Sequence, residues 1–148
     1  MTYDYFLALD TDRSDRDVEA MLSSVLAGLE GVPASVIGRA LSVDVEIPGR
    51  EAEVYAEIGI QASVLCCFSI DLKSPDSFDA GRAAAIAALR IVELLDADAA
   101  LTRYFENVLL RRLGGVLTLF EVPDFWEHYG AVDEVRGRFE VSDWNGHL

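Results

Sequence analysis

The residues of this chain that could do chemistry are few and do not form a local motif. Histidine is the commonest general base and metal ligand, and the chain has two, His128 and His147. His128 lies among aromatic residues, where we expect a packed side chain. The serines lie in no nucleophile elbow, and Gly114 and Gly115 lack the flanking residues of a phosphate-binding loop. The local motifs therefore indicate no enzyme, although carboxylates brought together with His128 from distant segments remain an alternative.

Four carboxylates near the N-terminus superficially resemble a calcium-binding loop: Asp10, Asp12, Asp15 and Asp17. A loop of the EF-hand type also needs a central glycine and a terminal glutamate at fixed spacing, and this segment has neither. We therefore expect these acids to favour the positive end of a following helix. The sequence predicts no metal site and no cofactor.

The two cysteines, Cys66 and Cys67, are adjacent. In a strand they point to opposite faces, and a disulfide between neighbours would be strained. We interpret them as small apolar side chains of a buried strand.

The charge of the chain limits its partners. The formal net charge is −14, from 26 acidic and 12 basic residues. This imbalance argues against nucleic acid and against anionic membrane surfaces, both of which require basic patches. Two interpretations remain open, simple solubility and steering toward a basic partner. The acids concentrate in residues 1–30, in residues 43–57 and from residue 121 onward, and would form a broad negative face if these blocks converge.

The last of these acidic blocks also carries aromatic residues, a combination that often concentrates binding energy in an interface. As a partner-facing patch we therefore consider Glu121, Asp124, Trp126, Glu127 and Asp133. The alternative is that Phe125 and Trp126 fold back and cover one end of a sheet.

The first half of the chain predicts strands and a helix that would position these groups. Residues 3–9 alternate between two faces that are both fairly apolar, which predicts an interior strand. An amphipathic helix follows a capping serine at Ser14 and ends before Pro33. Residues 41–47 alternate apolar and acidic side chains, as in a half-buried strand, and as an edge strand they could pair with another chain. A second β segment, clearest at residues 60–70, would pair with it as an antiparallel hairpin or meander.

The second half predicts a long alanine-rich helix over residues 78–95, in which Gly81 costs about 1 kcal/mol relative to alanine. The apolar residues of 99–112 fit helical spacing and equally fit two strands joined by a turn. We favour the strands, followed by a third at residues 116–120 and a short one at residues 138–141.

Together these elements predict one α+β domain over residues 1–148, with an irregular tail after about residue 130. An antiparallel or mixed sheet of about five or six strands would carry two helices packed on one face, in the order β-α-β-β-α-β-β-β. If residues 99–112 are helical, a three-helix version with a smaller sheet follows. No apolar run approaches the ~20 residues that span a bilayer, and the acidic N-terminus differs from a signal peptide, so we expect a cytoplasmic protein. The sequence leaves its oligomeric state open.

Three segments together resemble the swarming-inhibition (Sit) family of bacterial toxin-immunity proteins. They are TYDYFLALDTD with the helix after it, CCFSIDLKSPDSFDAGRAAAIAALRIVELL, and DADAALTRYFENVLLRRLGGVLTLFEVPDFWEHY. The resemblance implies a cytoplasmic protector, without a catalytic motif that could be transferred residue by residue. It predicts a non-enzymatic immunity protein that binds and neutralises a cognate toxin through an acidic surface, and the acidity suggests a basic toxin. The alternative is a small-molecule-binding or regulatory α+β domain with a pocket between the sheet and the long helix.

Overall fold

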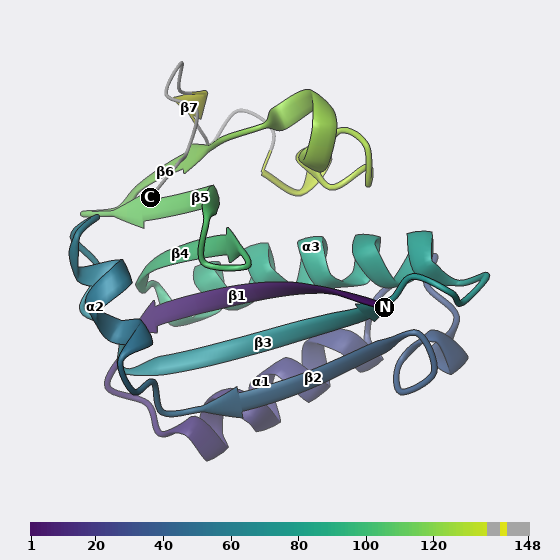
Figure 1. Cartoon of the computed structure of the whole chain (residues 1–148), viewed down its shortest axis with the longest axis horizontal. Coiled ribbons are helices and arrows are strands. Elements are labelled where there is room, and N and C mark those ends of the chain that lie inside the picture. The colour runs from purple at the N-terminus through teal and green to yellow at the C-terminus, as the bar shows by residue number, and fades with distance from the viewer. Residues whose placement is uncertain (136–139, 142–148) are drawn as a thin grey trace.

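The computed structural model describes residues 1–135 and the backbone of residues 140–141, and it contains one seven-stranded sheet (Figure 1). The order across the sheet is β2-β3-β1-β4-β5-β6-β7. All neighbouring strands are antiparallel except β6 and β7, which are parallel. The strands are β1 (Thr2–Asp10), β2 (Leu41–Glu46), β3 (Val64–Asp71), β4 (Asp98–Arg103), β5 (Asn107–Leu113), β6 (Val116–Leu119) and β7 (Glu140–Val141). The predicted α+β class is confirmed.

Strand β1 is interior, as the apolar character of both its faces predicts. It pairs with β3 on one side and with β4 on the other. Tyr5, Leu7 and Leu9 belong to the main core, whereas Ala8 belongs to a smaller cluster on the opposite face. Both faces of β1 are therefore covered over part of its length. This explains why the side chains on both faces are largely apolar.

Two long helices, α1 (Asp15–Ala27) and α3 (Ser77–Leu95), pack on one face of the sheet, as predicted (Figure 1). The hydroxyl of Ser14 accepts a hydrogen bond from the Asp17 amide at 3.1 Å and caps α1. In α3 the buried side is largely alanine, which lets this helix approach the sheet closely. Of the larger residues of this helix, Ile86, Leu89 and Val92 are buried, whereas Leu94 is 62% exposed.

The connection between β2 and β3 differs from the prediction. A third helix, α2 (Glu51–Ala56), stands where β structure or a turn was expected, and β3 begins only at Val64. The segment is rich in glutamate and alanine, both strong helix formers. Its apolar side lies over the second face of the sheet, where buried Tyr55 and Ile60 join Leu65 of β3 in the smaller cluster. The two strands nevertheless pair as predicted, antiparallel and side by side.

Residues 99–112 form strands, so the prediction is confirmed and the helical alternative is wrong. A bulge between Leu101 and Thr102 shifts the register of β4 against β5. The turn that joins these strands contains Tyr104 and Phe105 at φ values of +53° and +64°. Such left-handed conformations cost non-glycine residues about 1–2 kcal/mol each. Aromatic packing holds this turn, since the Phe105 and Phe6 rings stack with centroids 4.0 Å apart.

After β6 the chain forms three short elements. The π-helix η2 (Val122–Trp126) is followed by the 3₁₀ helix η3 (Val132–Val135) and by β7; a further 3₁₀ helix, η1 (Ala34–Val36), precedes β2. Of the short strand predicted at residues 138–141, the last two residues form β7, and residues 138–139 lie outside the described part of the chain.

Candidate functional site

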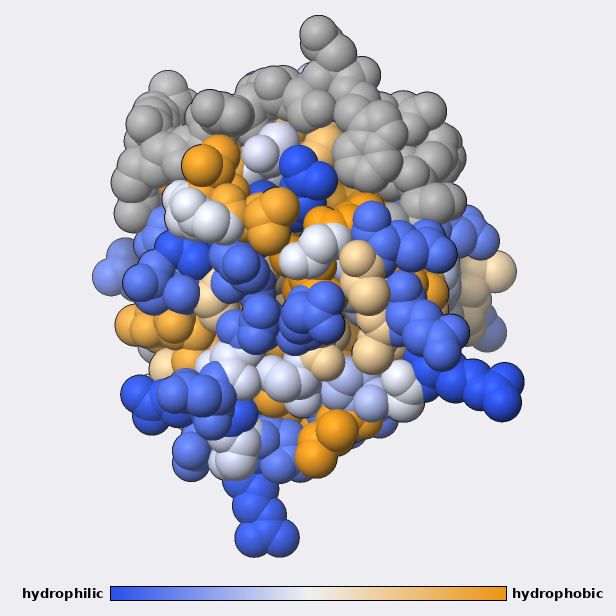
Figure 2. All heavy atoms as spheres, turned by 90° about the vertical axis from the view of Figure 1, so that its left-hand side faces the viewer, coloured by the Kyte–Doolittle hydropathy of each residue, from blue (hydrophilic) through white to orange (hydrophobic). Residues whose placement is uncertain are grey.

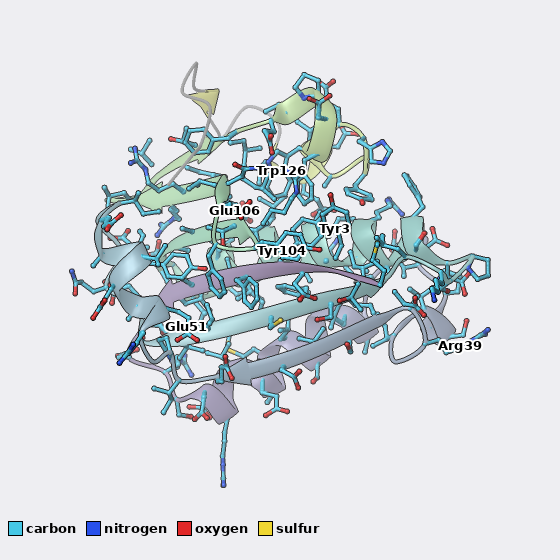
Figure 3. All side chains as sticks on the ribbon, viewed as in Figure 1. Tyr3, Arg39, Glu51, Tyr104, Glu106 and Trp126 are labelled. Carbon is cyan, nitrogen blue, oxygen red and sulfur yellow. The ribbon has the colours of Figure 1, made fainter. Side chains whose placement is uncertain are left out.

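The predicted acidic and aromatic patch begins with a buried residue. Trp126 is 0% exposed, and its indole Nε1–H donates a hydrogen bond to the Leu109 carbonyl of β5 at 2.8 Å. The Phe125 ring packs against it edge-on, with centroids 4.7 Å apart. Trp126 therefore belongs to the core and is not an exposed anchor for a partner. Phe125 and Trp126 are both buried, so the alternative, in which they fold back over the sheet, is the observed arrangement. Trp126 is labelled in Figure 3.

The carboxylates of this patch do not share one environment. Glu121 is half-buried and pairs with Arg103 of β4, with its Oε2 3.3 Å from Nη1. Asp124, Glu127 and Asp133 are exposed. The structure thus leaves acidic side chains at this surface but removes the tryptophan that would have supplied apolar contact.

His128 lies beside aromatic rings but is exposed to solvent, so the expected packed side chain is only partly realised. Its ring lies 4.7 Å from that of Tyr129 and 5.4 Å from that of Phe78, edge-on in both cases. It also lines a shallow cleft of about 220 Å³ with Arg103 and Asp124. Within residues 1–135 no hydrogen bond orients the imidazole, and His147 lies outside the described residues.

The N-terminal acids that superficially resemble a calcium loop are dispersed. Asp10 ends β1, whereas Asp15 and Asp17 lie in the first turn of α1, where they favour the positive helix end. Among the described residues, no three histidine, cysteine or carboxylate side chains are grouped so that they could hold a metal ion.

A second acidic surface lies on the open face of the sheet, opposite α1 and α3. The register places Asp44 of β2 opposite Cys67 of β3, and Asp4 of β1 opposite Ser69. The Ser69 hydroxyl donates to Asp4 Oδ1 at 2.7 Å and lies 3.7 Å from the Cys67 sulfur. Directly opposite residues share a face, so these acids and Glu46 form one group, which we call the open-face cluster: Asp4, Asp44 and Glu46.

The open-face cluster affects the pKa of the neighbouring Cys67 thiol. Burial raises the pKa of this thiol, and the three carboxylates of the cluster raise it further because they disfavour a nearby thiolate. None of the three takes part in an ion pair formed within the described part of the chain. Two of the three predicted acidic blocks therefore meet on this face. Sequence alternation identified the acids of β2, but only the strand order brings Asp4 beside them.

The adjacent cysteines behave as predicted. Cys66 is buried among the core residues that face the helices, while Cys67 is half-buried on the open face. Both are free thiols.

Open clefts lie at two edges of the helical layer. One, of about 380 Å³, lies between the end of α3 and strands β5 and β6, beside the Arg112–Asp96 ion pair. The other, of about 470 Å³, lies between α1 and β2 and is mainly apolar in its lining. The end of the molecule that carries α2 has hydrophilic side chains over its projecting parts, with hydrophobic ones between them (Figure 2).

Over the described residues, no helix has both the length and the apolar character needed to cross a membrane. No curated protein matches the sequence significantly. Among solved structures, the fold is similar to that of a chain in a CdiA-CT/CdiI toxin and immunity complex from Burkholderia pseudomallei, with a TM-score of 0.54 and 16% sequence identity over 72% of this chain and 95% of that one. The model of the SitI3-like family matches residues 3–130, and with the fold and the three sequence segments in agreement, the chain belongs to the SitI3-like family.

Proposed function

We propose that this protein is an immunity protein that binds a cognate bacterial toxin and neutralises it. The observation that carries the proposal is the family match over residues 3–130. The shared fold with a chain of a toxin and immunity complex agrees with it. A protein that protects in this way needs an exposed surface complementary to its toxin rather than a catalytic centre.

We further propose that the protein acts by binding alone and that its partner is basic. A net charge of −14 would speed encounter with a positively charged protein. The exposed His128 contacts the rings of Phe78 and Tyr129, and no hydrogen bond from the described residues orients its imidazole as a general base. An inhibitor of this kind would work in the cytoplasm, where free thiols such as Cys66 and Cys67 persist.

Two acidic surfaces are candidates for contact with the toxin. The first is the predicted C-terminal patch without its tryptophan, consisting of Glu121, Asp124, Glu127 and Asp133. The second is the open-face cluster. The carboxylates of the cluster form no ion pair with the described residues, so they need not break one before pairing with a partner.

The test is co-purification of the tagged protein with the product of the adjacent open reading frame at low and at high salt, together with a protection assay. Cells that express both proteins should survive, and the complex should weaken as salt screens the opposite charges. Growth arrest of the co-expressing cells at matched protein levels, with no complex at either salt, would refute the proposal for this partner.

A further inference from the structure

Strand β2 is an edge of the sheet, and from Val43 onward the outer side of its backbone is unpaired among the described residues. The Ala40 carbonyl accepts from the Asp71 amide at 2.9 Å on the β3 side, whereas the Leu41 carbonyl accepts from the Gly38 amide at 2.7 Å on the outer side. Backbone groups of successive strand residues point alternately to the two sides. Val43 and Val45 therefore direct their amides and carbonyls outward, where the described residues supply no backbone partner.

The apolar cleft of about 470 Å³ runs beside this free edge. It lies on the helix side of the sheet and is lined by Leu26 and Ala27 of α1, Ile37, Leu41 and Val43. The residue after the strand, Ile47, is 70% exposed. An added strand would thus find space and apolar contact for every second side chain on this face.

On the opposite face the same strand presents charge. Asp44 and Glu46 are exposed and belong to the open-face cluster. The alternate side chains of an added strand would meet these carboxylates. The edge therefore selects a segment in which apolar residues alternate with lysine or arginine.

We propose that the free edge of β2 is the docking site for an extended, basic segment of the cognate toxin, which adds a strand to the sheet. This inference rests on the proposed immunity function. Backbone pairing at Val43 and Val45 would supply the register, the cleft would take the apolar side chains, and the open-face cluster would pair with the basic ones.

Charge distinguishes this occupant from a second copy of the chain. Antiparallel pairing of two β2 strands would bring the Asp44 and Glu46 side chains of one copy close to those of the other. Like charges facing each other across a strand pair are destabilising. The edge is therefore better suited to a basic strand than to itself.

The experiment measures binding of the purified candidate toxin, the protein tested by co-purification above, to the full chain and two variants. Val45→Pro removes an outward amide while leaving the bonds to β3, and edge strands tolerate such prolines. Val45→Ala loses similar side-chain contact but keeps the amide. We expect Val45→Pro to weaken binding about tenfold or more relative to Val45→Ala, as loss of a buried hydrogen bond predicts. Equal affinities of the two variants would overturn the proposal.

Charge reversal compares the two acidic surfaces directly. Asp44→Lys should weaken binding more than the matched variant Asp124→Lys, and the reverse order would overturn the docking site in favour of the C-terminal patch. Failure of the unaltered chain to bind the toxin would instead refute the proposed function itself.

Hydrogen exchange on the unaltered chain keeps the proposal testable if a variant does not fold. The Val43 and Val45 amides should exchange rapidly in the free protein and slowly in the complex. If these amides stay unprotected in a formed complex, strand addition is refuted. If they become protected without toxin as the concentration of the chain rises, the edge pairs with a second copy and the proposal is also refuted.

Discussion

The substitution Gly81→Ala separates what helix propensity predicts from what the fold allows. Propensity alone predicts stabilisation by about 1 kcal/mol, since alanine is the better helix former. In the structure, a Cβ at position 81 would lie 2.3 Å from Cε1 and 2.4 Å from Cζ of Tyr129. Real Cβ atoms do not approach other atoms so closely, so the Tyr129 ring has to move.

The cost of that movement follows from the surroundings of the ring. Tyr129 is half-buried and contacts the rings of Phe78, Phe125 and His128 at centroid distances of 5.5, 5.3 and 4.7 Å. Overpacking of this kind typically costs about 1–3 kcal/mol. It therefore cancels or outweighs the propensity gain. In a Tyr129→Ala background the clash is absent, and Gly81→Ala should then stabilise the protein by about 1 kcal/mol.

Guanidinium unfolding of the four proteins in this double-mutant cycle provides the assay. The coupling free energy between the two positions should be about 1–3 kcal/mol. Stabilisation by the same amount in both backgrounds would show that Tyr129 does not rest on Gly81. It would also refute the packing of the segment after β6 against α3.

Three further predictions follow from the core. Trp126→Phe should lower the free energy of unfolding by about 1–3 kcal/mol, because it loses the hydrogen bond to Leu109 and has a smaller ring. The toxin affinity of the folded variant, measured by calorimetry, should stay within about threefold of that of the unaltered chain. Normal stability with lost affinity would show instead that Trp126 contacts the toxin. Phe105→Gly relieves a left-handed backbone but loses the stack on Phe6, and we expect a net destabilisation of about 1–2 kcal/mol by chemical unfolding; greater stability would show that strain dominates the turn. Burial raises the pKa of the Cys66 thiol from 9.0 to about 12. Above pH 9 the unfolded chain therefore loses a proton that the folded chain keeps, and stability should fall with rising pH up to about 12; Cys66→Ala should make this fall shallower, and an unchanged slope would contradict the assignment.

The elements that sequence predicted well are those with a local physical signature. Residues 3–9 alternate between two apolar faces, and Ser14 caps a helix with one apolar stripe. The short helix α2 lacks such a signature. A helix of only one or two turns is too short for hydrophobic periodicity to distinguish it from a strand. Helix α2 is stabilised instead by the packing of Tyr55 on the sheet.

The candidate site was less predictable because it depends on contacts between distant segments. The sequence marks Trp126 as an aromatic residue among acids, and nothing local reveals that its indole reaches the Leu109 carbonyl. The open-face cluster likewise joins Asp4 to Asp44 through the intervening strand β3, which neither segment encodes alone. The same holds for Gly81, whose neighbour Tyr129 lies far along the chain.

The central place of β1 in the sheet has a consequence for how the protein is made. Strand β1 leaves the ribosome before either neighbour, since β3 spans Val64–Asp71 and β4 spans Asp98–Arg103. Until both have been synthesised, its apolar side chains lack the strands that shield them, and pairing at such sequence separation is slow. A chain cut short before β4 would leave these apolar side chains without the strands that shield them, which is the kind of exposed surface that promotes aggregation.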